Sequence, residues 1–401
     1  MPKIEVKNLY KIFGPYPRQA LIKLQSGWSK EKLLRQTGHT VGIHNVSFSV
    51  EQGEIFVVMG LSGSGKSTLI RCINRLIEPT DGEIYIDGEN VTALSLDKLR
   101  LVRQKKLAMV FQRFALFPHR TILQNVAYGL EIQGVNKSAR EEKAYAVLET
   151  VGLKEWSAVY PEQLSGGMQQ RVGLARALAV DPDILLMDEP FSALDPLIRK
   201  EMQEELMELQ GKVQKTIIFI THDLDEALKL GDSIAIMKDG VIDQIGTPEE
   251  ILTNPATEYV ANFVNDVDRS RILKAENIMV RPTAHVSSND GPRVALRKMK
   301  EEALSSIFVI GEDRTLYGIV TVDRAVEAVK DKVTDLKKIV ETDIPVTAPD
   351  TLIQDLLPLA ATARVPIAVV DENRRLLGII MRVSVLAGLV GGGGDDNDSV
   401  A

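Results

Sequence analysis

The chain reads Gly60-Leu61-Ser62-Gly63-Ser64-Gly65-Lys66-Ser67-Thr68 directly after the apolar run 55–59 and before a segment with helical periodicity. In this strand-loop-helix context the stretch predicts a phosphate-binding loop. Its glycines let successive backbone N–H groups point at one polyphosphate, and the helix adds its positive end. Lys66 is then predicted to reach the β- and γ-phosphates, and Ser67 to ligate Mg²⁺. The Lys-Ser-Thr ending disfavours the alternative, a glycine-rich turn that binds nothing.

The bulk composition is that of a soluble globular protein, with 401 residues, 44% hydrophobic and 26% charged. This length predicts about two or three domains. No apolar run is long enough to cross a bilayer, and residues 1–5 lack the apolar core of a signal peptide, so we expect a cytosolic protein. The net charge of −7 argues against nucleic acid as a partner. The single cysteine, Cys72, excludes an intrachain disulfide.

An apolar run at 184–187 ends in two carboxylates, Asp188 and Glu189. Downstream of a phosphate loop, such a strand predicts the second half of a nucleotide site, in which Asp188 holds Mg²⁺ and Glu189 polarises a water. The alternative is a pair of solvated acids at a strand end, which the phosphate loop disfavours.

Two more apolar runs are predicted to be strands of the same sheet. The run 216–221 is followed by His222, and the run 107–111 delivers Gln112 at its end. In open α/β sheets, ligands gather at the carboxyl ends of the strands, which makes His222 a candidate for the same site.

A basic insert, residues 15–40, lies between strands predicted at 4–13 and 43–50. Its only acid is Glu31, and its pattern predicts two short amphipathic helices that break at Ser26-Gly27. Its cations are Arg18, Lys23, Lys30, Lys32 and Arg35.

The motif Leu164-Ser165-Gly166-Gly167 stands between Gln112 and the Asp188-Glu189 pair. With it, residues 1–265 resemble the nucleotide-binding subunit of an ABC transporter. The resemblance implies an α/β fold, an ABC-type P-loop NTPase domain with a mixed sheet and a helical subdomain. It also implies ATP, Mg²⁺ and a head-to-tail homodimer, in which the motif of one subunit closes over the phosphate loop of the other. A motif just before a helix offers N–H groups to a γ-phosphate, which agrees with this arrangement.

The resemblance further assigns roles to single residues. It implies that Phe13 stacks on adenine, that Asp195 lies in the loop that crosses the dimer, and that His222 contacts the γ-phosphate. Gln112 is implied to sense the γ-phosphate and to touch the transporter. The expected catalytic residues are Glu189, His222 and Gln112, and the expected metal site comprises Ser67, Gln112 and Asp188. The expected nucleotide-binding residues are Phe13, Gly60, Ser62, Gly63, Ser64, Gly65, Lys66, Ser67, Thr68, Ser165, Gly166, Gly167 and Asp195.

The sequence departs from the family pattern at two positions. Met168 stands where the motif usually has Gln, which removes a side-chain hydrogen bond but leaves the Ser165 and glycine contacts. Phe13 replaces the commoner Tyr or Trp and still offers a stacking face. Neither change argues against ATP hydrolysis.

A closer resemblance is to the ATPase of osmoregulated glycine betaine/proline uptake systems. It is carried by the basic insert and by the runs 109–119 and 191–199. It implies a peripheral subunit on the cytoplasmic face of the cell membrane, which energises import through an integral-membrane permease with a fused or separate substrate-binding protein. The alternatives are an importer for another amine or amino acid, and a soluble ABC-type protein without a transporter. A single cassette without coiled-coil arms disfavours the last of these.

Residues 308–320 align without gaps on residues 368–380, which indicates an internal repeat of strand, polar turn and strand. Predicted helices at 294–303 and 351–363 precede the two copies, and another helix follows each. The repeat resembles a tandem CBS pair, an α+β regulatory module. We expect a linker at 266–275, the module at 276–390 with repeats of about 276–331 and 335–390, and a flexible acidic tail at 391–401.

The match to the nucleotide sites of that family is partial. Asp323 stands one place earlier than the usual acid, and the second copy, around Met381 and Ser384, has neither the usual Thr nor the Asp. Ordinary AMP or ATP binding is therefore not expected. A cyclic dinucleotide such as c-di-AMP, held between two CBS pairs, needs no such acid.

The importer resemblance also suggests a role for the basic insert. An importer's ATPase lies beneath an anionic leaflet, whose attraction for cations weakens as salt rises. The insert could then hold the ATPase inactive on an anionic membrane surface at low ionic strength. The alternative, a solvated face, has equal weight.

Overall fold

The computed structural model describes residues 1–112, 115–192, 194–265 and 268–390. The tail expected at 391–401 and part of the linker expected at 266–275 lie outside them. The chain divides into two compact units, Met1–Val264 and Asn265–Ala401. Among the described residues, no helix has the length and apolar character needed to cross a membrane.

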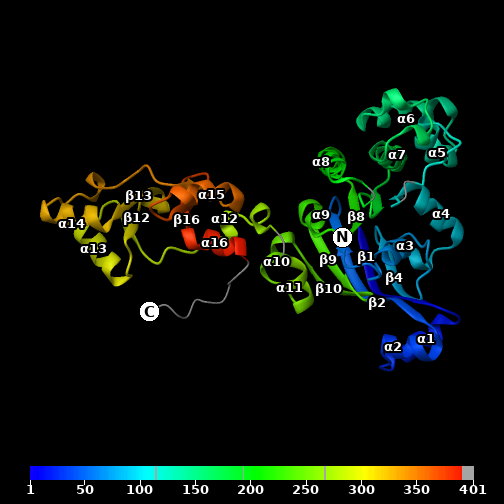
Figure 1. Cartoon of the computed structure of the whole chain (residues 1–401), viewed down its shortest axis with the longest axis horizontal. Coiled ribbons are helices and arrows are strands. Elements are labelled where there is room, and N and C mark those ends of the chain that lie inside the picture. Colours follow the sequence, from blue (N-terminus) through cyan, green and yellow to red (C-terminus); the bar gives the residue numbers. More distant parts are fainter. Residues whose placement is uncertain (113–114, 193, 266–267, 391–401) are drawn as a thin grey trace. The chain divides into compact units, whose positions relative to one another are not determined.

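A six-stranded sheet is the centre of the first unit (Figure 1), with strand order β10-β9-β3-β8-β7-β6. Strands β9, β3, β8, β7 and β6 run parallel, whereas β10 is antiparallel, so the predicted mixed sheet is confirmed. Every position of β3, β7 and β8 is buried, which explains their uninterrupted apolar sequences. Because these strands are parallel, their carboxyl ends meet at one edge. The bounds are β3 Ile55–Met59, β6 Leu107–Val110, β7 Ile184–Asp188, β8 Thr216–Thr221, β9 Ser233–Lys238 and β10 Val241–Gly246.

A second sheet, with order β2-β1-β4-β5, is antiparallel. It comprises β1 Ile4–Phe13, β2 Thr40–Val50, β4 Asp81–Ile86 and β5 Glu89–Asn90. The predicted first strand is confirmed. The predicted start of the next strand at Ile43 was wrong, because Thr40 and Val41 still pair with Phe13 and Ile12 at the end of β1. The two sheets share one hydrophobic core, in which the rings of Phe48 and Phe56 stack at 4.9 Å.

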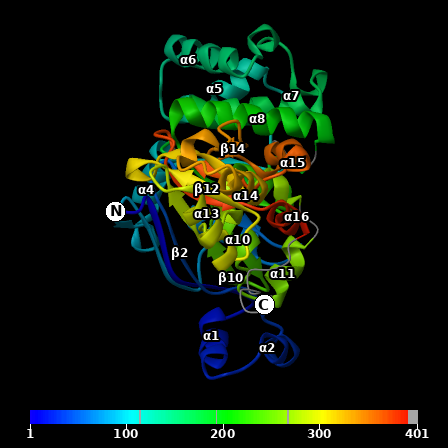
Figure 2. The same ribbon diagram turned by 90° about the vertical axis from the view of Figure 1, so that its left-hand side faces the viewer.

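Three helices, α5 Ile122–Ile132, α6 Lys137–Thr150 and α7 Gly166–Ala179, form a helical layer with its own core. The basic insert forms α1 Pro17–Gln25 and α2 Lys30–Thr37, which confirms the two predicted helices. Figures 1 and 2 place α1 and α2 at one end of this unit and the helical layer at the other. The remaining helices are α3 Lys66–Ile73, α4 Leu96–Lys105, α8 Pro196–Val213, α9 Leu224–Leu230, α10 Pro248–Thr253 and α11 Glu258–Val264.

The second unit repeats one pattern twice, as predicted. Each copy has a three-stranded sheet, and the two turns at the centre are joined by a hydrogen bond from Leu316 N–H to the Arg374 carbonyl at 2.8 Å. The first copy comprises α12 Ala275–Ile278, β11 His285–Ser287, α13 Pro292–Glu301, β12 Ser306–Ile310, β13 Leu316–Thr321 and α14 Val322–Lys330. The second comprises β14 Val346–Thr347, α15 Ile353–Thr362, β15 Ile367–Val370, β16 Leu376–Ile380 and α16 Arg382–Val390.

Candidate nucleotide site

The phosphate loop between β3 and α3 has a backbone that only glycine can adopt at two positions. Gly60 has φ 151°, and a Cβ there would lie 2.2 Å from the Met237 carbonyl oxygen. Gly65 has φ 102°, and its Cβ would lie 2.4 Å from the Gly42 carbonyl oxygen. Neighbouring backbone therefore fixes the loop in a tight curl directly before the N-terminus of α3, as a phosphate cradle requires. The other loop positions predicted to bind nucleotide, Ser62, Gly63, Ser64 and Thr68, lie in the same curl or in the first turn of α3.

Lys66 is the first residue of α3, and its side chain is only 4% exposed. Its Nζ donates to the carbonyl oxygens of Gly60 at 2.8 Å and Leu61 at 3.1 Å, and lies 3.9 Å from Glu189 Oε1. Burial lowers the pKa of Lys66, against the opposing charges of Glu189 and Asp188. The Lys66 ammonium group is thus held by carbonyl oxygens of the loop itself, and phosphate oxygens of a bound nucleotide could replace some of these hydrogen bonds.

Asp188 ends β7 as a buried carboxylate with two partners. Ser67 Oγ donates to its Oδ1 at 2.8 Å, and Arg71 Nη2 donates to its Oδ2 at 3.0 Å. A hydroxyl and a carboxylate in contact are hard oxygen donors, and Mg²⁺ in nucleotide sites takes only one or two such protein ligands beside the phosphates. The pair therefore fits the ion. The described residues contain no group of three or more His, Cys, Asp or Glu side chains suited to a metal.

Glu189 is the meeting point of the residues predicted to be catalytic. Its φ of 47° turns the chain sharply after β7, while its N–H donates to the Ile220 carbonyl of β8 at 3.1 Å. Its Oε2 lies 3.3 Å from His222 Nδ1, and Gln112 Nε2 donates to the same oxygen at 3.3 Å. Gln112 also donates to Ser192 at 3.3 Å. These contacts place Gln112 beside Glu189, whereas Ser67 contacts Asp188.

The Phe13 ring lies near the phosphate loop, at the end of β1. A Cβ built on Gly42 would lie 2.8 Å from the Phe13 ring and 3.5 Å from the Thr68 methyl group, so both side chains border the same glycine. The ring is partly exposed, and Lys11 Nζ lies 5.1 Å from its centroid. An aromatic face is therefore available close to the first turn of α3.

Ser165 and Asp195 are helix N-caps rather than neighbours of the phosphate loop. Ser165 Oγ accepts from Met168 N–H at 3.4 Å at the start of α7, and Asp195 Oδ1 accepts from Ile198 N–H at 3.1 Å at the start of α8. Ser165 and Gly166 are exposed, and a Cβ on Gly166 would meet nothing within 4 Å. Within the part of the chain that the structure describes, the hydrogen bonds of Ser165 and Asp195 are made to residues of α7 and α8 and not to the phosphate loop.

Sequence reasoning missed two arginines that support this site. Arg71 holds Asp188, and Arg199 donates from its Nη1 to Asp223, next to His222, at 3.1 Å. The signal for Arg71 is its spacing, one helical turn after Ser67 on the same face of α3. No local pattern indicates Arg199, because its partner is distant in the sequence.

Two family models match the chain. The model described as ABC transporter matches residues 43–192, and the model described as CBS domain matches residues 275–331 and 334–391. The glycine betaine/carnitine transport ATP-binding protein of Listeria monocytogenes serotype 1/2a (strain 10403S) is 55% identical over 391 residues, which are 98% of both chains. The glycine betaine transport ATP-binding protein of Bacillus subtilis (strain 168) is 54% identical over 97% of this chain and 93% of its own length.

A solved structure supports the assignment of the first unit. A dimeric ATP-binding cassette in a post-hydrolysis state, bound to ADP and Pi, shares 33% identity with a TM-score of 0.52 and covers 61% of this chain and 98% of its own. Its fold, the two family models and the near full-length relatives agree. The chain belongs to the ATP-binding subunits of ABC importers of the glycine betaine/proline uptake family, carries C-terminal tandem CBS domains, and is an ABC-type ATPase.

Proposed function

We propose that the chain hydrolyses ATP to drive import of a quaternary amine of the glycine betaine type through an integral-membrane permease, from the cytoplasmic face of the membrane. The observation that carries the ATPase half is the meeting of Lys66, Gln112 and His222 at the Glu189 carboxylate. The relatives named for glycine betaine transport support the solute class.

The test is transport by the assembled complex. We expect the chain to co-purify with an integral membrane protein, and proteoliposomes holding the complex to take up labelled glycine betaine in an ATP-dependent manner. Labelled choline, proline and an unrelated amino acid serve as competing cargoes. If the complex takes up only the unrelated amino acid, the assignment of glycine betaine as the solute is wrong. If the chain co-purifies with ribosomes instead of a membrane protein, the proposed import function is wrong.

We assign the hydrolytic roles from the contacts described above. Lys66 binds the β- and γ-phosphates, while Glu189 accepts a hydrogen bond from the attacking water and orients it for in-line attack. His222 and Gln112 hold the Glu189 carboxylate and face the γ-phosphate. Ser67 and Asp188 would hold Mg²⁺, which when bound neutralises charge on the phosphates.

A homodimer completes the site in this proposal. Ser165 and Gly166 are exposed at the N-terminal end of α7, and the Ser165 side chain, among the described residues, is bonded to α7 rather than to the phosphate loop. The phosphate loop and Phe13 of a second copy, arranged head to tail, supply the missing half. Asp195 then lies in the loop between the two copies. The related cassette is dimeric with ADP and Pi bound, which supports a dimer of this chain.

A groove between β6 and the helical layer is suited to a permease segment. It has a volume of about 240 Å³, and apolar side chains form much of its wall. Leu107, Met109, Tyr128, Ile132 and Val180 are among them. Because β6 leads directly to Gln112, a segment docked here would contact the strand that positions the γ-phosphate sensor. In this proposal, permease contact at the groove reaches the ATP site through β6.

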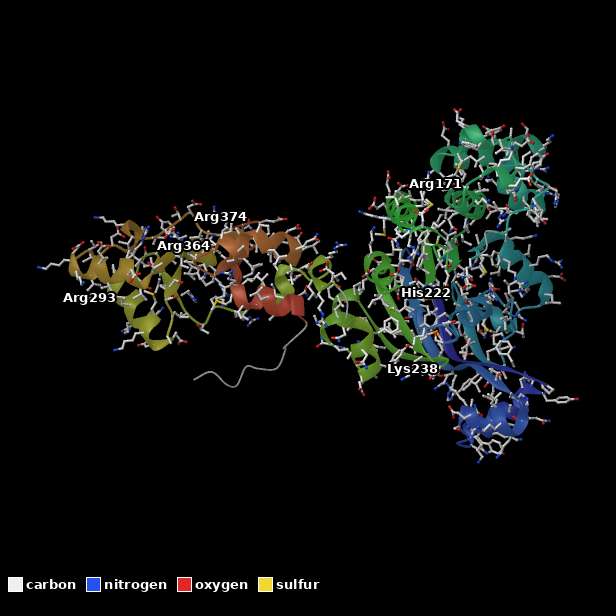
Figure 3. All side chains as sticks on the ribbon, viewed as in Figure 1. Arg171, His222, Lys238, Arg293, Arg364 and Arg374 are labelled. Carbon is white, nitrogen blue, oxygen red and sulfur yellow. The ribbon has the colours of Figure 1, made fainter. Side chains whose placement is uncertain are left out.

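The CBS module is proposed to bind an anionic nucleotide and to regulate the ATPase. Arg281, Arg314 and Arg375 line a cavity of about 360 Å³, and no described carboxylate pairs with any of them. Figure 3 shows Arg374, the neighbour of Arg375, in this unit. Three guanidinium groups around one cavity favour phosphate groups. A phosphodiester such as c-di-AMP, which needs no ribose-binding acid, fits this charge.

We expect inhibition by c-di-AMP to require these arginines. Replacing Arg281, Arg314 and Arg375 by Met should abolish inhibition of the reconstituted transporter, as should deletion from residue 276 onward, because the first unit has its own core. Arg293→Met, on α13 and outside the cavity, is the control. Undiminished inhibition of the triple variant would place any ligand elsewhere, and equal inhibition of the truncated transporter would rule out the module.

The basic insert is proposed to sense ionic strength through an anionic membrane surface. The cations of the insert differ in how well they could contact such a surface. Lys30 Nζ donates to the Asp239 carbonyl oxygen, and burial lowers its pKa. Arg18, Lys32 and Arg35 are exposed, and so are the apolar side chains of Tyr16, Ile22 and Leu34 in the same insert. Lys32 Nζ lies 4.5 Å from the centroid of the Trp28 ring. Each exposed cation near an anionic surface contributes about 1 kcal/mol, within a Debye length that falls from about 10 Å at 0.1 M salt to about 3 Å at 1 M.

We expect neutralisation of Arg18, Lys32 and Arg35 to glutamine to give transport that is active at low ionic strength. The measurement is uptake by vesicles of varied anionic-lipid content across a salt series. The control triple replaces Lys137 and Lys143 of α6, and Lys154 in the turn after it, by glutamine, and removes the same charge far from the insert in the sequence. If the insert variant keeps the wild-type salt threshold, the insert is not the sensor.

A further inference from the structure

One guanidinium group joins two loops that lead to the candidate nucleotide site. Arg199, in the first turn of α8, donates from Nη2 to the Leu194 carbonyl oxygen at 3.3 Å and from Nη1 to Asp223 Oδ2 at 3.1 Å. Leu194 directly precedes Asp195, the N-cap of α8. Asp223 directly follows His222 and is the N-cap of α9. Arg199 therefore connects the loop before α8 to the turn after β8.

A buried carboxylate, Glu226, supports this connection from the other side. The residue is 5% exposed, and it accepts from Thr221 Oγ1 at 2.6 Å and from Gln203 Nε2 at 3.2 Å. Arg199 Nε lies 3.8 Å from Glu226 Oε1 and is a buried nitrogen without a hydrogen-bond partner among the described residues. Burial raises the pKa of Glu226, against the hydrogen bonds and the Arg199 charge. A buried network of this kind restricts its members to one arrangement.

We propose that Arg199 is a positioning residue that couples the loop at Asp195 to the turn at His222. The inference rests on the proposed dimer and on the proposed role of His222. In that dimer Asp195 lies between the copies, so docking of the partner moves the Leu194–Asp195 loop. The guanidinium is planar and held on both sides, so it transmits this movement to the backbone at Asp223. His222 is then placed for hydrolysis only when the partner has docked.

The test is Arg199→Met in the full-length chain. We expect kcat to fall by about tenfold or more, because a misplaced catalytic group can cost about 10²-fold. ATP affinity, measured with a fluorescent analogue, should change less than about twofold, since the contacts of Arg199 are with Leu194, Asp223 and Glu226 and not with the phosphate loop. Lysine offers a point charge instead of a fork of donors, so Arg199→Lys should not restore kcat. Combining Arg199→Met with Asp223→Asn should lower kcat no further than either change alone.

Arg75→Met separates coupling from general stability. Its guanidinium likewise bonds two backbone carbonyls, of Val91 and Leu94 at 2.9 Å, and a carboxylate, but joins no loop of the candidate site. We expect Arg75→Met to lower the Tm about as much as Arg199→Met does, but to leave kcat near the wild-type value. Equal falls in kcat for Arg199→Met and Arg75→Met would overturn the coupling. So would a double variant, Arg199→Met with Asp223→Asn, whose fall in kcat is the product of the two single falls. Wild-type turnover of His222→Ala would overturn the proposed role of His222 and this coupling with it.

Discussion

Glu189→Gln is expected to abolish steady-state hydrolysis while ATP still binds. The Glu189 carboxylate directly follows β7 and has His222, Gln112 and Lys66 around it, but the phosphate loop is built by other residues. A positioned base typically contributes about 10²–10⁴-fold, so turnover should fall to about a hundredth or less. Because the amide has nearly the same shape, ATP should accumulate in the bound state, and the proposed dimer should become stable enough to isolate.

Phosphate release and size-exclusion chromatography with ATP measure the two parts of this expectation. Glu131→Gln is the matched control, because Glu131 pairs with Arg120 in the helical layer, away from the strand ends. Its turnover and its monomer fraction should equal those of the wild type. Turnover of Glu189→Gln above about a tenth of wild type would show that another group activates the water.

Most of the architecture could be predicted because it depends on local pattern. The strand 216–221 was predicted with its observed bounds, since an apolar run of this length that is rich in β-branched residues is too short for a typical helix. The two helices of the insert followed from the break at Ser26-Gly27. The placement of His222 at the same sheet edge as Glu189 also followed, because parallel strands end at a common edge, whereas the contact of Gln112 with Glu189 was not predicted.

The parts that could not be predicted depend on contacts between distant segments. The start of β2 at Thr40 is set by pairing with the end of β1, which no periodicity within 40–43 indicates. Arg199 and Glu226 form an ion pair only because α8 and α9 pack side by side. The left-handed φ of Glu189 likewise accompanies a hydrogen bond to Ile220 on the neighbouring strand, and its residue type does not indicate it.

Lys66→Met is expected to remove ATP binding without unfolding the chain. The Lys66 ammonium group is the cation that we expect to bind the phosphates. Its removal loses roughly two charge-assisted hydrogen bonds to ATP, so the Kd for ATP should rise by about 10²-fold or more. The free chain should tolerate the change, because burial already lowers the pKa of Lys66 and so indicates a cost of keeping it charged. Methionine fills similar space without that cost.

Thermal unfolding with and without ATP tests both halves of the Lys66 expectation. At an ATP concentration of 100 times the wild-type Kd, binding stabilises the wild type by about 2.7 kcal/mol. A Kd raised about 100-fold leaves about 0.4 kcal/mol, so the ATP-dependent rise in Tm should shrink to a small fraction in Lys66→Met. Lys215→Met is the control. Lys215 directly precedes β8, at the opposite end of that strand from His222, and the change removes its 2.8 Å ion pair with Asp181. This variant should keep the ATP-dependent rise in Tm. A full ATP-dependent rise in Lys66→Met would mean that the backbone N–H groups of the loop suffice for binding and that Lys66 acts only during phosphoryl transfer.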